Sequence, residues 1–203
     1  KFENILYEKK KGIAWITFNR PEKMNPLSSH LVEEAERAMD DAEGDAEVRV
    51  VVFTGSGKAF SAGADISELN RAVASYAEGR RVIEGVLGLF RRMELSRKPV
   101  IAAVNGFAMG GGCELCMASD IVIASDRALF GVPEASIGIM PGFAIIRGPS
   151  VLGRSATKLL AMTADHIDAK EAQRIGLVNV VVPPEKLLEE TERVARRIAA
   201  NAP

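Results

Sequence analysis

The alternation of apolar and polar positions divides the first part of the chain into strands and a helix. Residues 5–18 hold two short runs rich in β-branched and aromatic residues on either side of a Lys-Gly turn, which predicts a hairpin. Between residues 28 and 43, apolar positions recur every three or four residues, which indicates an amphipathic helix with Ser28 or Ser29 as its N-cap. Residues 48–55, VRVVVFTG, form a continuous apolar run that is typical of a buried strand.

The middle of the chain continues the same pattern. We expect a polar loop over residues 56–69, helices from there to residue 97, and a second buried strand at residues 100–105, VIAAVN. A glycine-rich turn and a short helix follow, and residues 120–125, DIVIAS, form the next strand. Strands that alternate with helices in this order are typical of a parallel sheet with crossover helices. The pattern therefore predicts an α/β fold in one main domain.

Composition narrows the class of protein further. The chain has 203 residues, of which 47% are hydrophobic, so it can bury one sizeable core. Lys and Arg number 26 against 27 Asp and Glu, and the net charge of -1 offers no electrostatic reason to expect nucleic acid or an anionic membrane as a partner. With two cysteines and no long apolar run, we expect a soluble protein of the cytoplasm, or of the mitochondrial matrix if a transit peptide has been removed.

Two glycine patterns suggest nucleotide binding, but neither satisfies its motif. In TGSGKAF, Lys58 is followed by Ala59 where a P-loop needs Ser or Thr, and Val52 stands where the first glycine of that loop belongs. Residues 106–112 do not match the spacing G-x-G-x-x-G of a dinucleotide site. The sequence therefore disfavours both kinds of nucleotide-binding loop.

Cys113 and Cys116 form a C-x-x-C pair, which could be a redox dithiol or half of a zinc site. A second pair of cysteines is missing, and His30 and His166 lie far away in the sequence. We therefore predict no metal site and expect the two cysteines to be small apolar residues of the core. His166 is expected on the surface or at a helix cap.

Two carboxylates stand in unusually apolar surroundings. Glu114 directly follows the three glycines at the start of a short apolar helix, and Glu134 lies within FGVPEASIGIMPG. One interpretation is structural, with Glu114 capping its own helix and Glu134 in a surface turn. The other is a pair of carboxylates, brought together from neighbouring turns, that acts as acid and base on one substrate. Spacing alone does not separate these two interpretations.

Two glycine-containing loops follow the carboxyl ends of predicted parallel strands, where α/β sheets place ligands. They are FSAGAD, at residues 60–65, and AMGGGCE, at residues 108–114. Backbone N–H groups from two such loops can converge on one oxygen, and the positive end of the helix that begins near Gly111 would strengthen the site. Such an oxyanion hole suits a carbonyl that becomes an enolate.

The sequence resembles the crotonase (enoyl-CoA hydratase/isomerase) superfamily nearly from end to end. The resemblance rests on long blocks in family order: ITFNRPEKMNPLS, VVVFTGSGKAFSAGADISEL, KPVIAAVNGFAMGGGCELCMASDIVIAS, FGVPEASIGIMPG and DAKEAQRIGLVNVVVPPEKL. It implies a ClpP/crotonase-like core of repeated β-β-α units with short perpendicular strands over residues 1–203. It also implies a homotrimer or hexamer that acts on an acyl-CoA thioester, with no other cofactor, no nucleic acid and no membrane as a partner.

The resemblance assigns roles to individual residues. The N–H groups of Ala64 and Gly111 correspond to the family's oxyanion hole, and Glu114 and Glu134 correspond to the two glutamates of its hydratases. Glu114 is expected to activate water for attack on C3, and Glu134 to exchange the proton at C2. The residues implied in binding the substrate and its CoA are Met24, Ala62, Ala64, Asp65, Ile66, Gly110 and Gly111, with Lys23 and Lys58 as candidate phosphate partners. Asp65 could instead only cap the helix that follows it.

The chain departs from the family pattern in two places. Phe143, Ala144, Ile145 and Ile146 replace the small and polar residues that hydratases usually carry after Pro-Gly, which puts the acyl specificity in question. The family usually continues for several helices beyond a position like Pro203. We therefore expect an enoyl-CoA hydratase core without the usual C-terminal helices. The alternatives are an enoyl-CoA isomerase and a noncatalytic relative that binds acyl-CoA or RNA.

Overall fold

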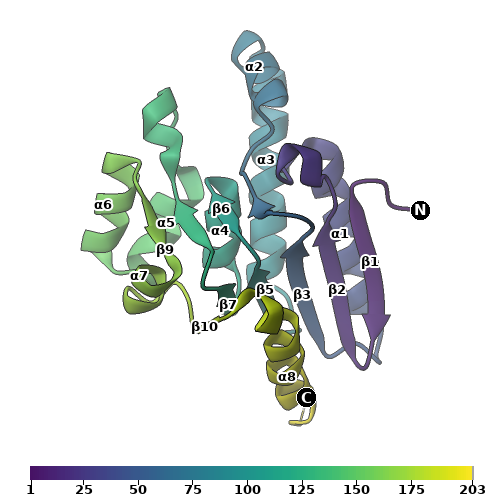
Figure 1. Cartoon of the computed structure of the whole chain (residues 1–203). Coiled ribbons are helices and arrows are strands. Elements are labelled where there is room, and N and C mark those ends of the chain that lie inside the picture. Colours follow the sequence, from purple (N-terminus) through teal and green to yellow (C-terminus); the bar gives the residue numbers. More distant parts are fainter. Residues whose placement is uncertain (203) are drawn as a thin grey trace.

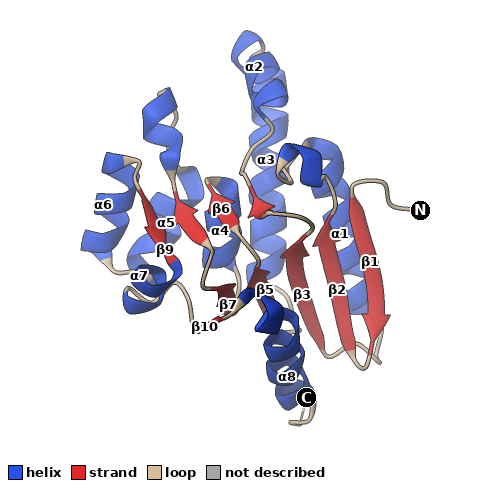
Figure 2. Cartoon of the chain, in the orientation of Figure 1, coloured by secondary structure: helices blue, strands red, loops and turns tan. Residues whose placement is uncertain are grey.

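A computed structural model describes residues 1–202, with the backbone alone for residues 72–74. Its strands and helices are shown in Figures 1 and 2. The strands are β1 (Ile5–Lys10), β2 (Ile13–Phe18), β3 (Val50–Gly55), β4 (Ala59–Ser61), β5 (Val100–Val104), β6 (Phe107–Met109), β7 (Ile121–Ser125), β8 (Leu129–Gly131), β9 (His166–Asp168) and β10 (Val180–Val182). The α-helices are α1 (Ser29–Gly44), α2 (Ile66–Ala74), α3 (Tyr76–Glu94), α4 (Gly111–Ala118), α5 (Gly142–Val151), α6 (Arg154–Thr163), α7 (Ala169–Arg174) and α8 (Leu187–Ala199). The short 3-10 helices are η1 (Pro21–Lys23), η2 (Pro133–Ile137) and η3 (Pro184–Lys186).

The long strands form one sheet in the order β1-β2-β3-β5-β7-β10. β1 pairs with β2 antiparallel, which confirms the predicted hairpin, and the remaining neighbours run parallel. Val51 and Phe53 of β3 face the core that includes α1, α3 and α4, whereas Val50 and Val52 face α8 on the other side. Because the central strands are buried on both faces, they read as continuous apolar runs rather than as alternating ones.

Three-residue strands form a second sheet in the order β4-β6-β8-β9. β4, β6 and β8 each follow a long parallel strand and each precede a helix, so the repeated β-β-α units of the expected fold are present (Figure 2). The expected loop over residues 56–69 is wrong in part, because it contains β4 and the start of α2. A strand of three residues is too short to produce a periodic pattern.

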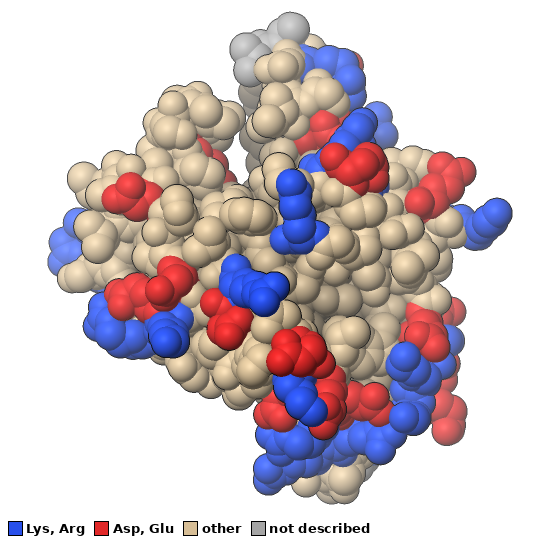
Figure 3. Space-filling model, viewed as in Figure 1, with Lys and Arg blue, Asp and Glu red and all other residues tan. Residues whose placement is uncertain are grey.

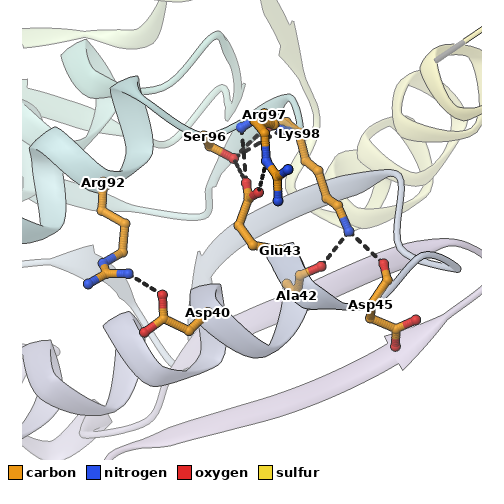
Figure 4. A network of polar contacts seen from close by, with 8 residues as sticks. All are labelled: Asp40, Ala42, Glu43, Asp45, Arg92, Ser96, Arg97 and Lys98. Carbon is orange, nitrogen blue, oxygen red and sulfur yellow. Dashed lines mark hydrogen bonds and ion pairs between the residues drawn. The ribbon is translucent and has the colours of Figure 1, made fainter.

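The C-terminal end of α1 is tied to the loop between α3 and β5 (Figure 4). The Lys98 ammonium donates to the carbonyl oxygens of Ala42 and Asp45, the latter at 2.6 Å. The Glu43 carboxylate accepts from the Ser96 hydroxyl and from the Arg97 backbone N–H. A cation that bonds the last carbonyls of a helix also interacts favourably with its dipole, so this network fixes α1 against the entrance to β5.

Charged side chains of both signs are intermixed on the face shown in Figure 3, most densely around α8. On that helix Arg193 pairs with Glu190 and Arg196 pairs with Glu192. This face therefore has no surface of one sign that would attract a polyanion. Within residues 1–202, the helices are all too short or too polar to cross a bilayer.

Candidate active site

Pairing between β6 and β8 brings Glu134 to the start of α4. Met109 lies opposite Gly131 in the two strands, and the Gly110 N–H donates to the Gly131 carbonyl at 2.8 Å. Glu134 follows in η2, and a Cβ placed on Gly110 would lie 2.6 Å from its Oε1. Glu114 lies one helical turn beyond, since its N–H donates to the Gly110 carbonyl at 2.9 Å. Both carboxylates therefore belong to one site at the first turn of α4.

Glu114 is held by another helix. Its side chain is only 7% exposed, and its Oε1 accepts from the N–H groups of Phe143 at 3.0 Å and Ala144 at 2.8 Å. The interpretation that Glu114 caps its own helix is therefore wrong: it caps the first turn of α5. Because α5 contributes backbone N–H groups, this contact does not depend on the side chains of Phe143 and Ala144. Burial raises the pKa of the Glu114 carboxyl, and these two N–H groups oppose the rise.

Glu134 is held much less firmly. Its Oε2 is buried and has no hydrogen-bond partner among the residues described. Burial raises the pKa of its carboxyl from 4.5 to about 7; its own backbone N–H opposes the rise, and the negative charge of Glu114 adds to it. Glu134 lies in a short, largely exposed 3-10 turn, as the structural interpretation expected, but its carboxyl packs against Gly110. The hydrogen bonds favour the charged form at Glu114, so a single proton on the pair is best placed on Glu134.

Each glycine of the triplet faces a different neighbour. Gly110 has φ of 51° and packs against the Glu134 carboxyl. A Cβ on Gly111 would lie 3.0 Å from the Leu27 side chain, and one on Gly112 would lie 2.4 Å from the Ser61 carbonyl oxygen. The three glycines therefore let the start of α4 lie close to Glu134, Leu27 and Ser61, where side chains would collide.

The loop after β4 packs directly on the same turn. A Cβ on Gly63 would lie 2.7 Å from the Met109 carbonyl oxygen and 3.2 Å from the Gly111 nitrogen. The next residue, Ala64, forms a parallel bridge with Leu27. In the described part of the chain, the N–H groups of Ala64 and Gly111 donate to no acceptor. Two unengaged donors from adjacent loops, one of them at the N-terminus of α4, are suited to bind one oxygen.

The pattern of the enoyl-CoA hydratase/isomerase family matches residues 8–203. The chain belongs to this family. It is 47% identical to the short-chain-enoyl-CoA hydratase of Clostridium acetobutylicum, over the whole of this chain and 78% of that protein. It is also 47% identical to the crotonyl-CoA hydratase of Syntrophomonas wolfei, over 98% of this chain and 77% of that protein.

Solved structures of the family have the same fold. A putative enoyl-CoA hydratase/isomerase from Legionella pneumophila superposes with a TM-score of 0.96 at 35% identity, over 100% of this chain and 79% of that one. A Bacillus anthracis enoyl-CoA hydratase superposes with a TM-score of 0.94 at 37% identity, over 98% of this chain and 78% of that one. The crotonase fold expected from the sequence is thereby confirmed.

The residues that the resemblance assigned to CoA lie around the loop after β4. Met24 is partly exposed at 37% and its carbonyl accepts from the Ala62 N–H at 2.9 Å, and Ile66 is exposed at 72%. The carboxylate of Asp65 is already engaged: it accepts from the Ser67 N–H and hydroxyl and pairs with Arg20 at 3.0 Å. Its side chain therefore caps α2, which was the alternative role predicted for Asp65.

Lys23 and Lys58, the candidate phosphate partners, are both exposed on neighbouring turns. The turns are adjacent because a Cβ on Gly57 would lie 2.9 Å from the Pro21 side chain. The role of these two lysines as phosphate partners stays a prediction.

The cysteine pair is part of the core. Cys113 is fully buried and Cys116 is 1% exposed, as expected for small apolar residues. Burial raises the pKa of both thiols, and the negative charges of Glu114 and Glu134 raise that of Cys113 further. Neither thiol is thus prone to become a thiolate. His166 is exposed, as expected, and residues 1–202 contain no cluster of three metal-binding side chains.

Arg20 and Asn25 also support the loop after β4, although no pattern in the sequence singles them out. Asn25 is fully buried, and the Arg20 side chain makes the largely buried ion pair with Asp65. Both belong to the block ITFNRPEKMNPLS, where the local sequence indicates only that they are polar residues in a turn. Their burial follows from packing against residues 56–65, which lie far along the chain.

Proposed function

We propose that the chain is an enoyl-CoA hydratase, which adds water reversibly to a 2-enoyl-CoA thioester and forms the 3-hydroxyacyl-CoA. The observation that carries this proposal is a pair of carboxylates, one buried and one half-buried, with unequal hydrogen bonding. Glu114 accepts two backbone N–H groups, whereas Glu134 has a buried oxygen with no partner in the described chain. Such a pair holds a base and an acid at the same pH, which hydration requires.

The thioester carbonyl would accept hydrogen bonds from the N–H groups of Ala64 and Gly111. These donors stabilise the negative charge that develops on the oxygen while water attacks C3. Glu114 takes one proton from the water as its oxygen bonds to C3, and Glu134 gives its proton to C2. The pair carries one proton before and after the step, so protons and charges balance.

We propose a short acyl chain for the substrate. Support comes from the two relatives at 47% identity, whose names are short-chain-enoyl-CoA hydratase and crotonyl-CoA hydratase. The chain itself adds a bulky side chain next to the catalytic carboxylate, because Phe143 donates its N–H to Glu114 and packs on Phe90 with ring centroids 4.8 Å apart. We infer that this ring limits the length of the acyl chain, and the relative rates with crotonyl-CoA and a longer enoyl-CoA test this.

The test is the loss of enoyl absorbance from crotonyl-CoA, repeated with Glu114→Gln and Glu134→Gln. A general acid or base contributes typically about 10²–10⁴-fold to a rate, so each variant should lose at least about a hundredfold in kcat. Glu114→Gln should still bind acyl-CoA. Glu171→Gln is the matched control, because that carboxylate is on α7 and bonds only Arg174.

The outcomes separate hydratase from its alternatives. Formation of 3-hydroxybutyryl-CoA that requires both glutamates supports the proposal. Conversion of a 3-enoyl-CoA to the 2-enoyl-CoA without hydration of crotonyl-CoA would identify an isomerase instead. Binding of acyl-CoA with neither reaction would leave a noncatalytic relative.

We further propose that the chain assembles as a homotrimer or as a dimer of trimers. Support comes from large apolar side chains exposed on η2, α5 and α6 and in the turn between η2 and α5: Ile137, Met140, Ile146 and Met162 are each 65–77% exposed. Because α6 packs against both η2 and α5, these side chains lie on adjoining elements, and a contiguous exposed apolar patch is typical of an interface. Light scattering coupled to size exclusion should give three or six times the mass of one chain, and Ile146→Glu should lower that mass.

A further inference from the structure

Asn25 is a buried side chain that the proposed chemistry does not use. It is fully buried and follows η1 with φ of 54°, directly after Met24 with φ of 62°. Two consecutive left-handed residues other than glycine are unusual, and asparagine tolerates this conformation better than most side chains. Such strain persists only where the surroundings hold it in place.

The Asn25 carboxamide uses its full length to join two segments. Its Oδ1 accepts from the Arg20 N–H at 2.8 Å, which closes the turn of residues 20–25. Its Nδ2 donates to the carbonyl oxygens of Ser56 at 2.9 Å and Ala59 at 2.8 Å. The turn is therefore fastened to the segment that leads into β4.

Backbone hydrogen bonds on either side of Asn25 then reach the oxyanion loop. The Ala62 N–H donates to the Met24 carbonyl at 2.9 Å, and the Leu27 N–H donates to the Gly63 carbonyl at 2.7 Å. The Gly63 carbonyl and the Ala64 N–H belong to one planar trans peptide, in which C=O and N–H point in opposite directions. The bond from Leu27 therefore fixes the direction in which the Ala64 N–H points.

We propose that Asn25 is a positioning residue that aims the Ala64 N–H at the substrate carbonyl. It acts through the backbone of residues 24–27 and does not touch the substrate. The inference rests on the proposed function, because it needs a thioester carbonyl at Ala64 and Gly111. Without the carboxamide, the turn of residues 20–25 loses its bonds to Ser56 and Ala59, and Leu27 is held less firmly in the place from which it bonds the Gly63 carbonyl.

The test compares Asn25→Ala, Asn25→Asp and Asn25→Gly with Asn105→Ala in the full chain. Asn25→Asp keeps the acceptor but loses both donors, and Asn25→Gly keeps the backbone conformation while losing the carboxamide. Asn105 is the matched control, because its Nδ2 also donates to the Ala59 carbonyl, at 3.2 Å, and to the Gly57 carbonyl, at 3.0 Å. It holds the same segment that leads into β4 but makes no hydrogen bond to residues 20–27.

The decisive measurement is carbonyl polarisation. The probe is 4-(dimethylamino)cinnamoyl-CoA, whose absorption moves to longer wavelength when its carbonyl accepts strong hydrogen bonds. We expect the red shift of the bound probe to fall by at least half in folded Asn25 variants and to be unchanged in Asn105→Ala. With crotonyl-CoA, kcat should fall at least tenfold in the Asn25 variants while KM changes less than threefold.

Other outcomes overturn either the inference or the proposed function on which it rests. An Asn25→Gly variant with the full shift and full kcat would show that the carboxamide only stabilises the fold. An equal loss in Asn105→Ala would assign the effect to loosening of residues 55–59. A wild-type chain that shifts the probe without hydrating crotonyl-CoA would refute the hydratase proposal but leave the Asn25 test intact, and an absent wild-type shift would refute the carbonyl site itself.

Discussion

Raising the pH from 6 to 8 should lower kcat/KM by about tenfold. In the free enzyme, the pair needs one proton, which Glu134 holds because burial raises its pKa to about 7. With that pKa, the singly protonated fraction falls from about nine-tenths at pH 6 to about one-tenth at pH 8. The sign is a loss with rising pH, because the acid that protonates C2 is the species that disappears.

The kcat/KM of the reverse reaction should fall over the same range of pH. Hydration takes up no net proton, so dehydration of 3-hydroxybutyryl-CoA also starts from a pair that carries one proton. A mechanism with one ionised glutamate as the base, as in a simple isomerase, would instead gain activity as the pH rises. The sign of the pH dependence therefore separates a pair that carries one proton from a single ionised base.

The assay is the initial rate at low crotonyl-CoA concentration between pH 5.5 and 9 at constant ionic strength. The Glu171→Gln control should follow the wild-type profile. A kcat/KM that is flat or rises between pH 6 and 8 would refute the assignment of the proton to a buried Glu134.

Three further perturbations follow from particular contacts. Burial raises the pKa of Glu134 from 4.5 to about 7, so this carboxyl destabilises the folded protein progressively as the pH rises through that range. Glu134→Gln should therefore raise Tm at pH 8 and not at pH 5. An equal change in Tm at both pH values would contradict this. Gly110→Ala should lower kcat roughly a hundredfold, because the new Cβ would lie 2.6 Å from Glu134 Oε1 and the residue has a φ of 51°. An unchanged kcat would show that the reaction does not need Glu134 in a fixed position. Lys98→Met removes two hydrogen bonds to carbonyls at the end of α1, so it should lower the free energy of unfolding in urea by about 1–3 kcal/mol. Lys170→Met, at an exposed position, is the control, and an equal loss in both variants would contradict the role of Lys98.

The sequence by itself determined the long elements and the kind of chemistry. The hairpin of residues 5–18 and the helix that begins at Ser29 follow from local periodicity, and Ser28 is its N-cap, accepting from the Leu31 N–H at 3.3 Å. The three glycines before Glu114 indicated close approach of the backbone to a ligand or a neighbour. These features were readable because they depend on residues near one another in the chain.

Only the tertiary structure decided which groups meet and what their environment is. The three-residue strands β6 and β8 carry no periodic signal, yet their pairing places Glu134 against Gly110. Likewise, the capping of α5 by Glu114 and the burial of Asn25 depend on segments about 30 residues away in the chain. Hydrogen bonding and desolvation between distant segments set the direction of an N–H group and the pKa of a carboxyl, and a local pattern of residues contains neither.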